Sequence, residues 1–166
     1  ETIVTETTVL NADGSTTTTS VNRSVDGSAH QQIIVTTSDD GLTITTQEDW
    51  DNDGDFDETV VVQTSLSSDG SITETATSTA ADGGVLNTQT RTSSADRNTT
   101  VESFDADGNG VADSVTTSEI ADDGTTSIFT EFFSYGGIVE ASMRTFVSAD
   151  GLSIFTELDR NGDDEI

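Results

Sequence analysis

The sequence has no cysteine and no proline, and its five basic residues are all arginine, so lysine is absent as well. Without cysteine, disulfide bonds and thiolate chemistry are excluded. No apolar run approaches the length of a membrane-spanning helix, and the first residues do not form a signal peptide. We therefore expect no membrane insertion.

Acidic residues dominate the charge of the chain: 32 of them against five arginines give a formal net charge of -27 at pH 7. Such a surface repels nucleic acid and anionic membranes, because phosphate contacts dominate affinity for nucleic acid. The same charge opposes a compact state through self-repulsion, and bound cations would offset part of it. The composition thus predicts a fold that depends on metal or salt, and no nucleic-acid partner.

Turn signals divide the sequence into short segments, mostly 13 to 14 residues apart. Most are Asp-Gly pairs, in which glycine supplies the positive φ of a hairpin turn. One such position holds Asp96-Arg97-Asn98 instead, and we expect Asn98 to adopt the left-handed conformation there. The segments between turns are rich in Thr, Val, Ile, Ser and Phe, which favours strands.

Short connections make neighbouring strands antiparallel. The sequence therefore predicts an all-β fold, an antiparallel meander of about twelve strands built as an elongated repeat array or a sandwich. Four strands would form each repeat of about 54 residues. The predicted repeats are 1–57, 58–112 and 113–166 of one continuous array. Because their strands carry few large apolar groups, threonine ladders and metal loops must supply part of the stability.

A carboxylate-rich loop recurs three times, and its glycines Gly54, Gly108 and Gly162 are 54 residues apart. Oxygen ligands at alternate positions around a glycine suit a hard divalent cation, and calcium fits best. Magnesium prefers to keep several waters, and zinc lacks its Cys and His ligands here. The candidate metal ligands are Asp49, Asp51, Asp53, Asp55, Asp57, Asp105, Asp107, Asn109, Asp113, Asp159, Asn161, Asp163 and Glu165.

The register of the loops is open at this point. A D-x-D-x-D-G-x-x-D pattern fits the first loop around Gly54 and, less completely, the third around Gly162, whereas the second fits when the frame moves by two, around Gly110. We expect the carboxylates of the third loop to be completed by residues beyond Ile166 or from a neighbouring subunit. We expect the large apolar residue beside each loop to pack beneath it: Trp50, Phe104 and Leu158. The alternative is that Asp, Asn and Gly are simply good loop residues.

Catalytic signals are weak. The single histidine, His30, is flanked by glutamines, and no Gly-x-Ser-x-Gly motif or phosphate-binding glycine motif occurs. We therefore expect no enzyme.

Three segments of the chain resemble the Thr/Asp/Gly-rich tandem repeats of large exported calcium-binding bacterial proteins, of the RTX-adhesin kind. These segments are Ser38-Asp39-Asp40-Gly41-Leu42-Thr43, Ser148-Ala149-Asp150-Gly151-Leu152-Ser153 and Phe104-Asp105-Ala106-Asp107-Gly108-Asn109-Gly110. The resemblance implies export, calcium-dependent rigidity and a role at the bacterial cell surface or in the extracellular matrix. The Gly-Gly-x-Gly-x-Asp nonapeptide is absent, so a parallel β-roll is not implied. The acidic loops also resemble those of integrin-like propeller blades, but three units cannot close a propeller.

The first four residues, Glu1-Thr2-Ile3-Val4, resemble Glu58-Thr59-Val60-Val61, so the sequence begins and ends at nearly the same phase of its repeat. We expect a slice of a longer array, or a subunit that associates head to tail with its neighbours. The expected function is a calcium-stabilised structural segment of an extracellular bacterial adhesin or filament. The alternative is a glycan- or matrix-binding β module that uses Phe132, Phe133 and Tyr135.

Overall fold

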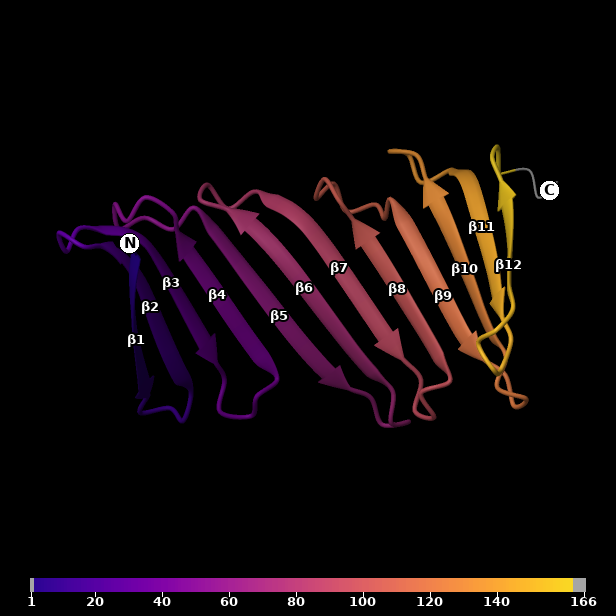
Figure 1. Cartoon of the computed structure of the whole chain (residues 1–166), viewed down its shortest axis with the longest axis horizontal. Helices are drawn as coiled ribbons and strands as arrows, with labels where there is room; N and C mark the ends of the chain where they lie inside the picture. Colours follow the sequence, from indigo (N-terminus) through magenta and orange to yellow (C-terminus); the bar gives the residue numbers. More distant parts are fainter. Residues whose placement is uncertain (1, 163–166) are drawn as a thin grey trace. The chain divides into compact units, whose positions relative to one another are not determined.

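The computed structural model describes residues 2–162, and these form twelve antiparallel strands that follow one another in sequence order in one sheet (Figure 1). The strands are β1 (Thr2–Leu10), β2 (Thr16–Ser24), β3 (Ala29–Thr37), β4 (Thr43–Asp49), β5 (Glu58–Leu66), β6 (Ile72–Ala80), β7 (Val85–Ser93), β8 (Thr99–Asp105), β9 (Ser114–Ile120), β10 (Thr126–Phe133), β11 (Val139–Val147) and β12 (Ile154–Asp159). The predicted all-β antiparallel meander is confirmed. Within the described residues, no helix has the length and apolarity that crossing a membrane requires.

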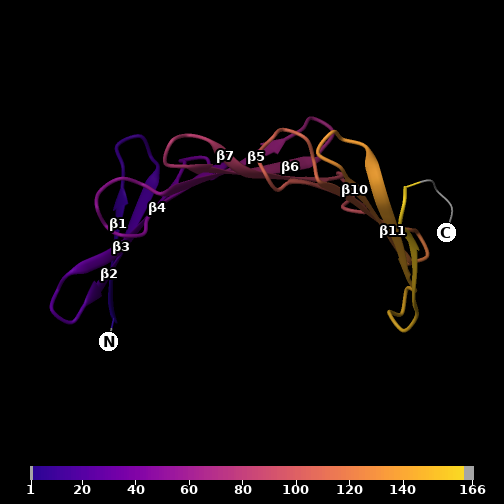
Figure 2. The ribbon, with the colours of Figure 1, turned by 90° about the horizontal axis from the view of Figure 1, so that it is seen from above.

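The chain divides into two compact units, one with residues 1–64 and 75–86 and the other with residues 65–74 and 87–166. Within each unit the strands form a single layer (Figure 2). The three predicted repeats do not coincide with these units and stay a prediction.

Several hairpin turns are held by the aspartate that precedes the glycine of the turn. In the first turn, Asn11 N–H donates to the Ser15 carbonyl at 2.8 Å, and Gly14 has φ +88°. Asp13 Oδ1 accepts the N–H of Ser15 at 3.0 Å and its hydroxyl at 2.7 Å. Equivalent pairs of bonds are made by Asp26, Asp69 and Asp123. These aspartates serve the turns by fixing the backbone with a side-chain acceptor.

The prediction for Asn98 is wrong. Arg97, one residue earlier, has φ +65°, and its N–H donates to the Ser94 carbonyl at 3.0 Å. Gly41 has the same place in its turn, with φ +71° and an N–H donated to the Ser38 carbonyl. An arginine thus occupies a left-handed position that glycine fills elsewhere, because the hydrogen-bonding pattern of the turn, and not the residue type, sets the backbone there.

No hydrophobic side chain is buried among residues 2–162. The buried residues are all polar: Ser15, Asp49, Ser78, Asp105, Thr130 and Asp159. Threonine hydroxyls contact each other across neighbouring strands, as expected, in the pairs Thr8–Thr18, Thr17–Thr36, Thr73–Thr92, Thr116–Thr130 and Thr145–Thr156. Because the usual apolar core is missing, backbone ladders and polar contacts carry the fold.

Candidate metal centres

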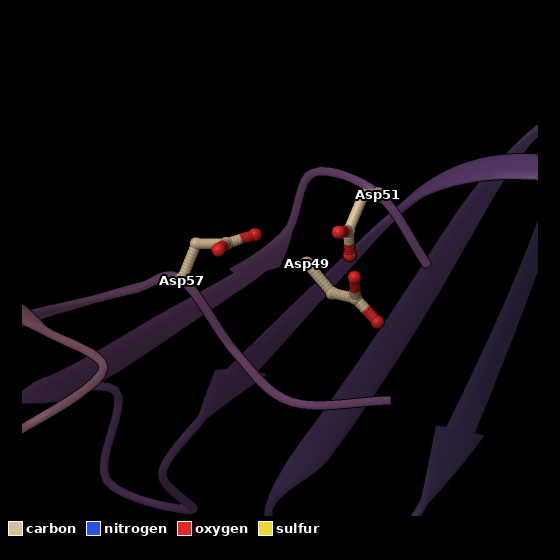
Figure 3. Close-up of side chains that lie close together, drawn as sticks. All are labelled: Asp49, Asp51 and Asp57. Atoms are coloured by element: carbon tan, nitrogen blue, oxygen red, sulfur yellow. The ribbon is translucent and has the colours of Figure 1, made fainter. Parts of the chain in front are cut away.

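Two clusters of three carboxylates lie in the loops that join β4 to β5 and β8 to β9. One oxygen from each of Asp49, Asp51 and Asp57 lies within 4.8 Å of the others (Figure 3). Asp49 ends β4, and Asp57 directly precedes β5, so the strand pairing brings the two ends of the loop together.

The second cluster consists of Asp105, Asp107 and Asp113, with the same spacing and the same limit of 4.8 Å. Asp105 ends β8, and Asp113 directly precedes β9. Each cluster could hold a metal ion, since one oxygen from each of its three carboxylates lies within 4.8 Å of the others.

The first aspartate of each loop is buried and organises the loop backbone. Asp49 is 1% exposed, and its carboxylate accepts the N–H groups of Asp53 at 3.2 Å and Gly54 at 3.0 Å. Asp105 is 8% exposed and accepts N–H groups from Gly108 and Gly110, each at 2.8 Å. Burial of an ionised group is tolerated only where hydrogen bonds satisfy it, and the loop supplies them.

The last aspartate closes the loop on its first residue. Asp57 Oδ2 accepts the N–H of Trp50 at 2.7 Å, and Asp113 Oδ2 accepts the N–H of Ala106 at 2.6 Å. The middle aspartates also bind backbone, since Asp51 accepts the Asp53 N–H at 3.2 Å. These bonds hold the carboxylates near one another through the chain itself.

These hydrogen bonds align the first two loops at an interval of 56 residues, not 54. Gly54 matches Gly110, with φ +101° and +85°, and Asn52 matches Gly108, with φ +58° and +69°. Both loops therefore follow one pattern with glycine at the sixth position. The 54-residue spacing of Gly54 and Gly108 pairs residues with different roles.

The fifth loop position binds the backbone two residues later. Asp53 Oδ1 accepts the N–H of Asp55 at 2.9 Å, and Asn109 Oδ1 accepts the N–H of Val111 at 2.7 Å. Neither Asp53 nor Asp55 belongs to the carboxylate cluster of its loop. Asp55 corresponds to Val111, so its side chain is not part of the shared pattern. The Nδ2 atom of Asn109 is buried with no hydrogen-bond partner.

Burial raises the pKa of Asp105, but the N–H groups of Gly110, Gly108 and Asn109 donate to its carboxylate and outweigh the burial. The pKa of Asp105 therefore lies below its ordinary value, and the group is ionised at neutral pH. An ionised, buried carboxylate is the form that a cation binds.

The third loop is described only in part. Asp159 ends β12 and is 4% exposed, and its Oδ1 accepts the N–H groups of Asn161 at 3.1 Å and Gly162 at 3.0 Å. Gly162 has φ +68°, as Gly108 has +69°. The predicted ligands Asp163 and Glu165 lie outside the described residues.

The expectation that an apolar residue packs beneath each loop is wrong. Trp50, Phe104 and Leu158 are 53%, 41% and 46% exposed. They also occupy different places, since Trp50 follows the first aspartate of its loop and the other two precede it. The indole Nε1–H of Trp50 donates to the Glu48 carboxylate at 2.9 Å, in an exposed contact.

One contact beside the first loop carries no sequence signal. Glu58, directly after Asp57, accepts a hydrogen bond from the hydroxyl of the buried Ser78 on β6.

The aromatic residues of the alternative hypothesis lie on and beside β10, where Phe132 is 41% and Tyr135 is 76% exposed.

No protein-family model matches the chain, and no curated protein matches it.

Proposed function

We propose that this chain is a calcium-stabilised structural repeat segment of an extracellular bacterial adhesin or filament, with no catalytic activity. The observation that carries the proposal is the recurrence of one carboxylate cluster in two loops with the same hydrogen bonds. The loops belong to a sheet in which no hydrophobic side chain is buried among the described residues. The resemblance to Thr/Asp/Gly-rich repeats of exported proteins supports the same assignment.

Calcium is the ion that suits these clusters. It takes six to eight oxygen ligands in flexible geometry, whereas magnesium keeps several waters in a strict octahedron. Asp49, Asp51 and Asp57 would hold the ion in the first loop, and Asp105, Asp107 and Asp113 in the second. The ion would supply positive charge where carboxylates crowd.

Calcium would stabilise the fold by removing repulsion. Without an ion the clustered carboxylates repel one another, in a chain whose formal charge is already -27. Each occupied site would raise the free energy of unfolding by RT ln(1 + [Ca]/Kd), about 1.4 kcal/mol when calcium exceeds Kd tenfold. Extracellular calcium modules have Kd values on the order of 0.1 to 1 mM. Such affinities would keep the sites empty in a calcium-poor cytoplasm and fill them after export.

Isothermal titration calorimetry tests this proposal. The intact chain should bind at least two calcium ions, with Kd values in that millimolar to submillimolar range, and should bind magnesium more weakly. The variant in which both Asp51→Asn and Asp107→Asn are introduced should lose this binding. A chain that binds no calcium, or that binds it equally well after both substitutions, would contradict the proposal.

A glycan- or matrix-binding module is the second candidate, and the exposure of Tyr135 and Phe132 favours it. Exposed aromatic rings offer apolar contact area to a ligand, and the hydroxyl of Tyr135 adds a hydrogen-bonding group. A monomer whose migration is retarded in a polysaccharide gel, and restored by Tyr135→Ala, would support this candidate. Unchanged migration in both forms would exclude it for that polysaccharide.

A further inference from the structure

Strands β1 and β12 each have one strand neighbour in the described sheet. The chain has no proline and no lysine, two residues that commonly protect an edge strand from pairing. Their ladders with β2 and β11 also run without a bulge. Because twelve strands alternate in direction, β1 and β12 are antiparallel to each other in the order of the sheet. A second copy added at β12 would therefore continue the alternation.

Strand β1 is the equivalent of β5. Both have nine residues, and each leads into a turn with the same bond, Asn11 N–H to the Ser15 carbonyl and Ser67 N–H to the Ser71 carbonyl. Thr2 thus takes the place of Glu58. The sequence comparison, which paired Glu1 with Glu58, is one residue out of register.

Strand β12 is the equivalent of β4 and β8. Each of the three ends in a buried aspartate, namely Asp49, Asp105 and Asp159. Each also follows a turn with the same bond between its first and last residue: Ser38 to Thr43, Ser94 to Thr99 and Ser148 to Ser153.

The β4–β5 and β8–β9 pairs therefore serve as templates for a pairing of β12 with β1. In β4–β5, Thr45 lies opposite Val61, and in β8–β9, Val101 lies opposite Thr117. Because β1 matches β5 in length and in the turn that follows it, the β4–β5 ladder transfers directly to β12 and β1. The β8–β9 ladder gives the same register when β9 is aligned with β5 at the aspartates that precede them, Asp113 and Asp57. This register pairs Leu158 with Thr2, Glu157 with Ile3, Thr156 with Val4, Phe155 with Thr5, Ile154 with Glu6 and Ser153 with Thr7.

We propose that β12 of one copy of this chain pairs with β1 of a second copy in this register, so that copies join head to tail. The inference deepens the proposed structural function and rests on it for its biological meaning. Charge favours this pairing over the symmetric one. Glu6 and Glu157 would face the apolar Ile154 and Ile3, whereas two full-length β1 strands paired antiparallel would place Glu6 opposite Glu6.

Disulfide trapping tests the register, since the chain has no cysteine of its own. Hydrogen-bonded and non-hydrogen-bonded pairs alternate along an antiparallel ladder. Leu42 and Thr64 form a hydrogen-bonded pair, so Thr45 and Val61, three positions along, form a non-hydrogen-bonded pair. Phe155–Thr5 is the equivalent pair between copies. Such pairs have Cα atoms about 4.5 Å apart, which a disulfide can bridge. Mixing the Phe155→Cys and Thr5→Cys variants under mild oxidation should give a cross-linked dimer.

The matched control mixes Phe155→Cys with Glu6→Cys, because adjacent residues of a strand point to opposite faces. This mixture should cross-link far less. Equal cross-linking of both mixtures, dimers of Thr5→Cys alone as the main product, or no cross-link at all would overturn the proposal.

Sedimentation velocity provides a second readout. In an antiparallel ladder every second residue of a strand donates its N–H group to the neighbouring strand. Asn11 donates to Ser15, so the residues of β1 an odd number of positions away, including Val4 and Leu10, have N–H groups that point away from β2. Only Val4 belongs to the six proposed pairs. Val4→Pro should therefore abolish concentration-dependent oligomers, and Leu10→Pro should leave them.

A circular dichroism melt of the same variants, with calcium and with EGTA, separates this proposal from the proposed function. Calcium-dependent melting without cross-linking or oligomers would overturn the pairing and leave calcium stabilisation standing. Cross-linking in the expected register with identical melts would support the pairing and contradict calcium stabilisation.

Discussion

The carboxylate of Asp57 accepts the backbone N–H of Trp50 at 2.7 Å, so the last residue of the first acidic loop holds the residue that follows Asp49. Asp113 and Ala106 repeat this relationship at 2.6 Å in the second loop. The chain thus builds each carboxylate cluster with its own hydrogen bonds. A cation would enter a site whose ligands the backbone has already gathered.

Replacing Asp57 by asparagine should separate its two roles. Asp57→Asn keeps an oxygen that can accept the Trp50 N–H but removes one negative charge from the cluster. We expect the calcium affinity of that loop to fall at least about tenfold, or about 1.4 kcal/mol, because ligand charge sets affinity in such sites. Calorimetric titration measures the change.

The matched control for this prediction is Asp55→Asn, in the same loop but outside the cluster. It changes the net charge equally and should leave the affinity nearly unchanged. A similar loss in both variants would show that overall charge, and not the cluster, governs binding.

Replacing Arg97 by glycine should stabilise the fold. Arg97 has φ +65°, in a turn position that Gly41 and Gly151 fill elsewhere. A non-glycine residue in this conformation destabilises the fold by roughly 1 to 2 kcal/mol. The flexibility of glycine in the unfolded chain offsets part of the stability gained by the substitution. Urea denaturation should show a gain of about 0.5 to 1 kcal/mol. The reciprocal change Gly41→Ala should cost stability, and a destabilised Arg97→Gly would contradict the account of this turn.

The hairpin aspartates predict a loss of stability in acid. The N–H and the hydroxyl of Ser71 donate to Asp69 and hold its pKa below the ordinary value. A lowered pKa in the folded state contributes stability above the unfolded pKa of about 4, and this contribution is lost as pH falls through the folded pKa. Asp69→Asn keeps the acceptor but cannot titrate.

Urea midpoints of Asp69→Asn and the unmodified chain provide the test. The unmodified chain should be the more stable at pH 7, and the difference should shrink between pH 5 and pH 3. A difference that is constant over this range would contradict the role of the ionised carboxylate.

Monovalent salt should stabilise the calcium-free chain. Its charge of -27 is spread over a sheet in which no hydrophobic side chain is buried among residues 2–162. Raising sodium chloride from 20 to 500 mM shortens the Debye length from roughly 20 to roughly 4 Å and screens the repulsion. Thermal melts in EGTA should shift upward with salt. A melting temperature that is independent of salt would show that self-repulsion does not limit the fold.

The sequence was sufficient for the fold class because each turn carries a local signal. Asp69-Gly70 and its equivalents specify a turn through a side-chain acceptor and a positive φ, and short turns make neighbours antiparallel. Arg97 was missed because the hydrogen bond to Ser94 sets its conformation regardless of residue type.

The candidate ligands were found by composition, but their register was not. Gly54 and Gly108 are both glycines with positive φ, so spacing alone paired them, although the bonds to Asp49 and Asp105 pair Gly54 with Gly110. The exposure of Trp50 was also unexpected. Because the strands form a single layer, an apolar residue beside a loop has no second layer against which it can pack.

The most direct test of calcium stabilisation is the thermal melt of the intact chain, followed by far-ultraviolet circular dichroism in EGTA, in millimolar calcium and in millimolar magnesium. The account predicts a cooperative β-sheet melt in calcium at a clearly higher temperature than in EGTA, with a smaller shift in magnesium. Identical melts in EGTA and calcium would contradict it, and the acidic loops would then be connectors whose carboxylates serve only the backbone.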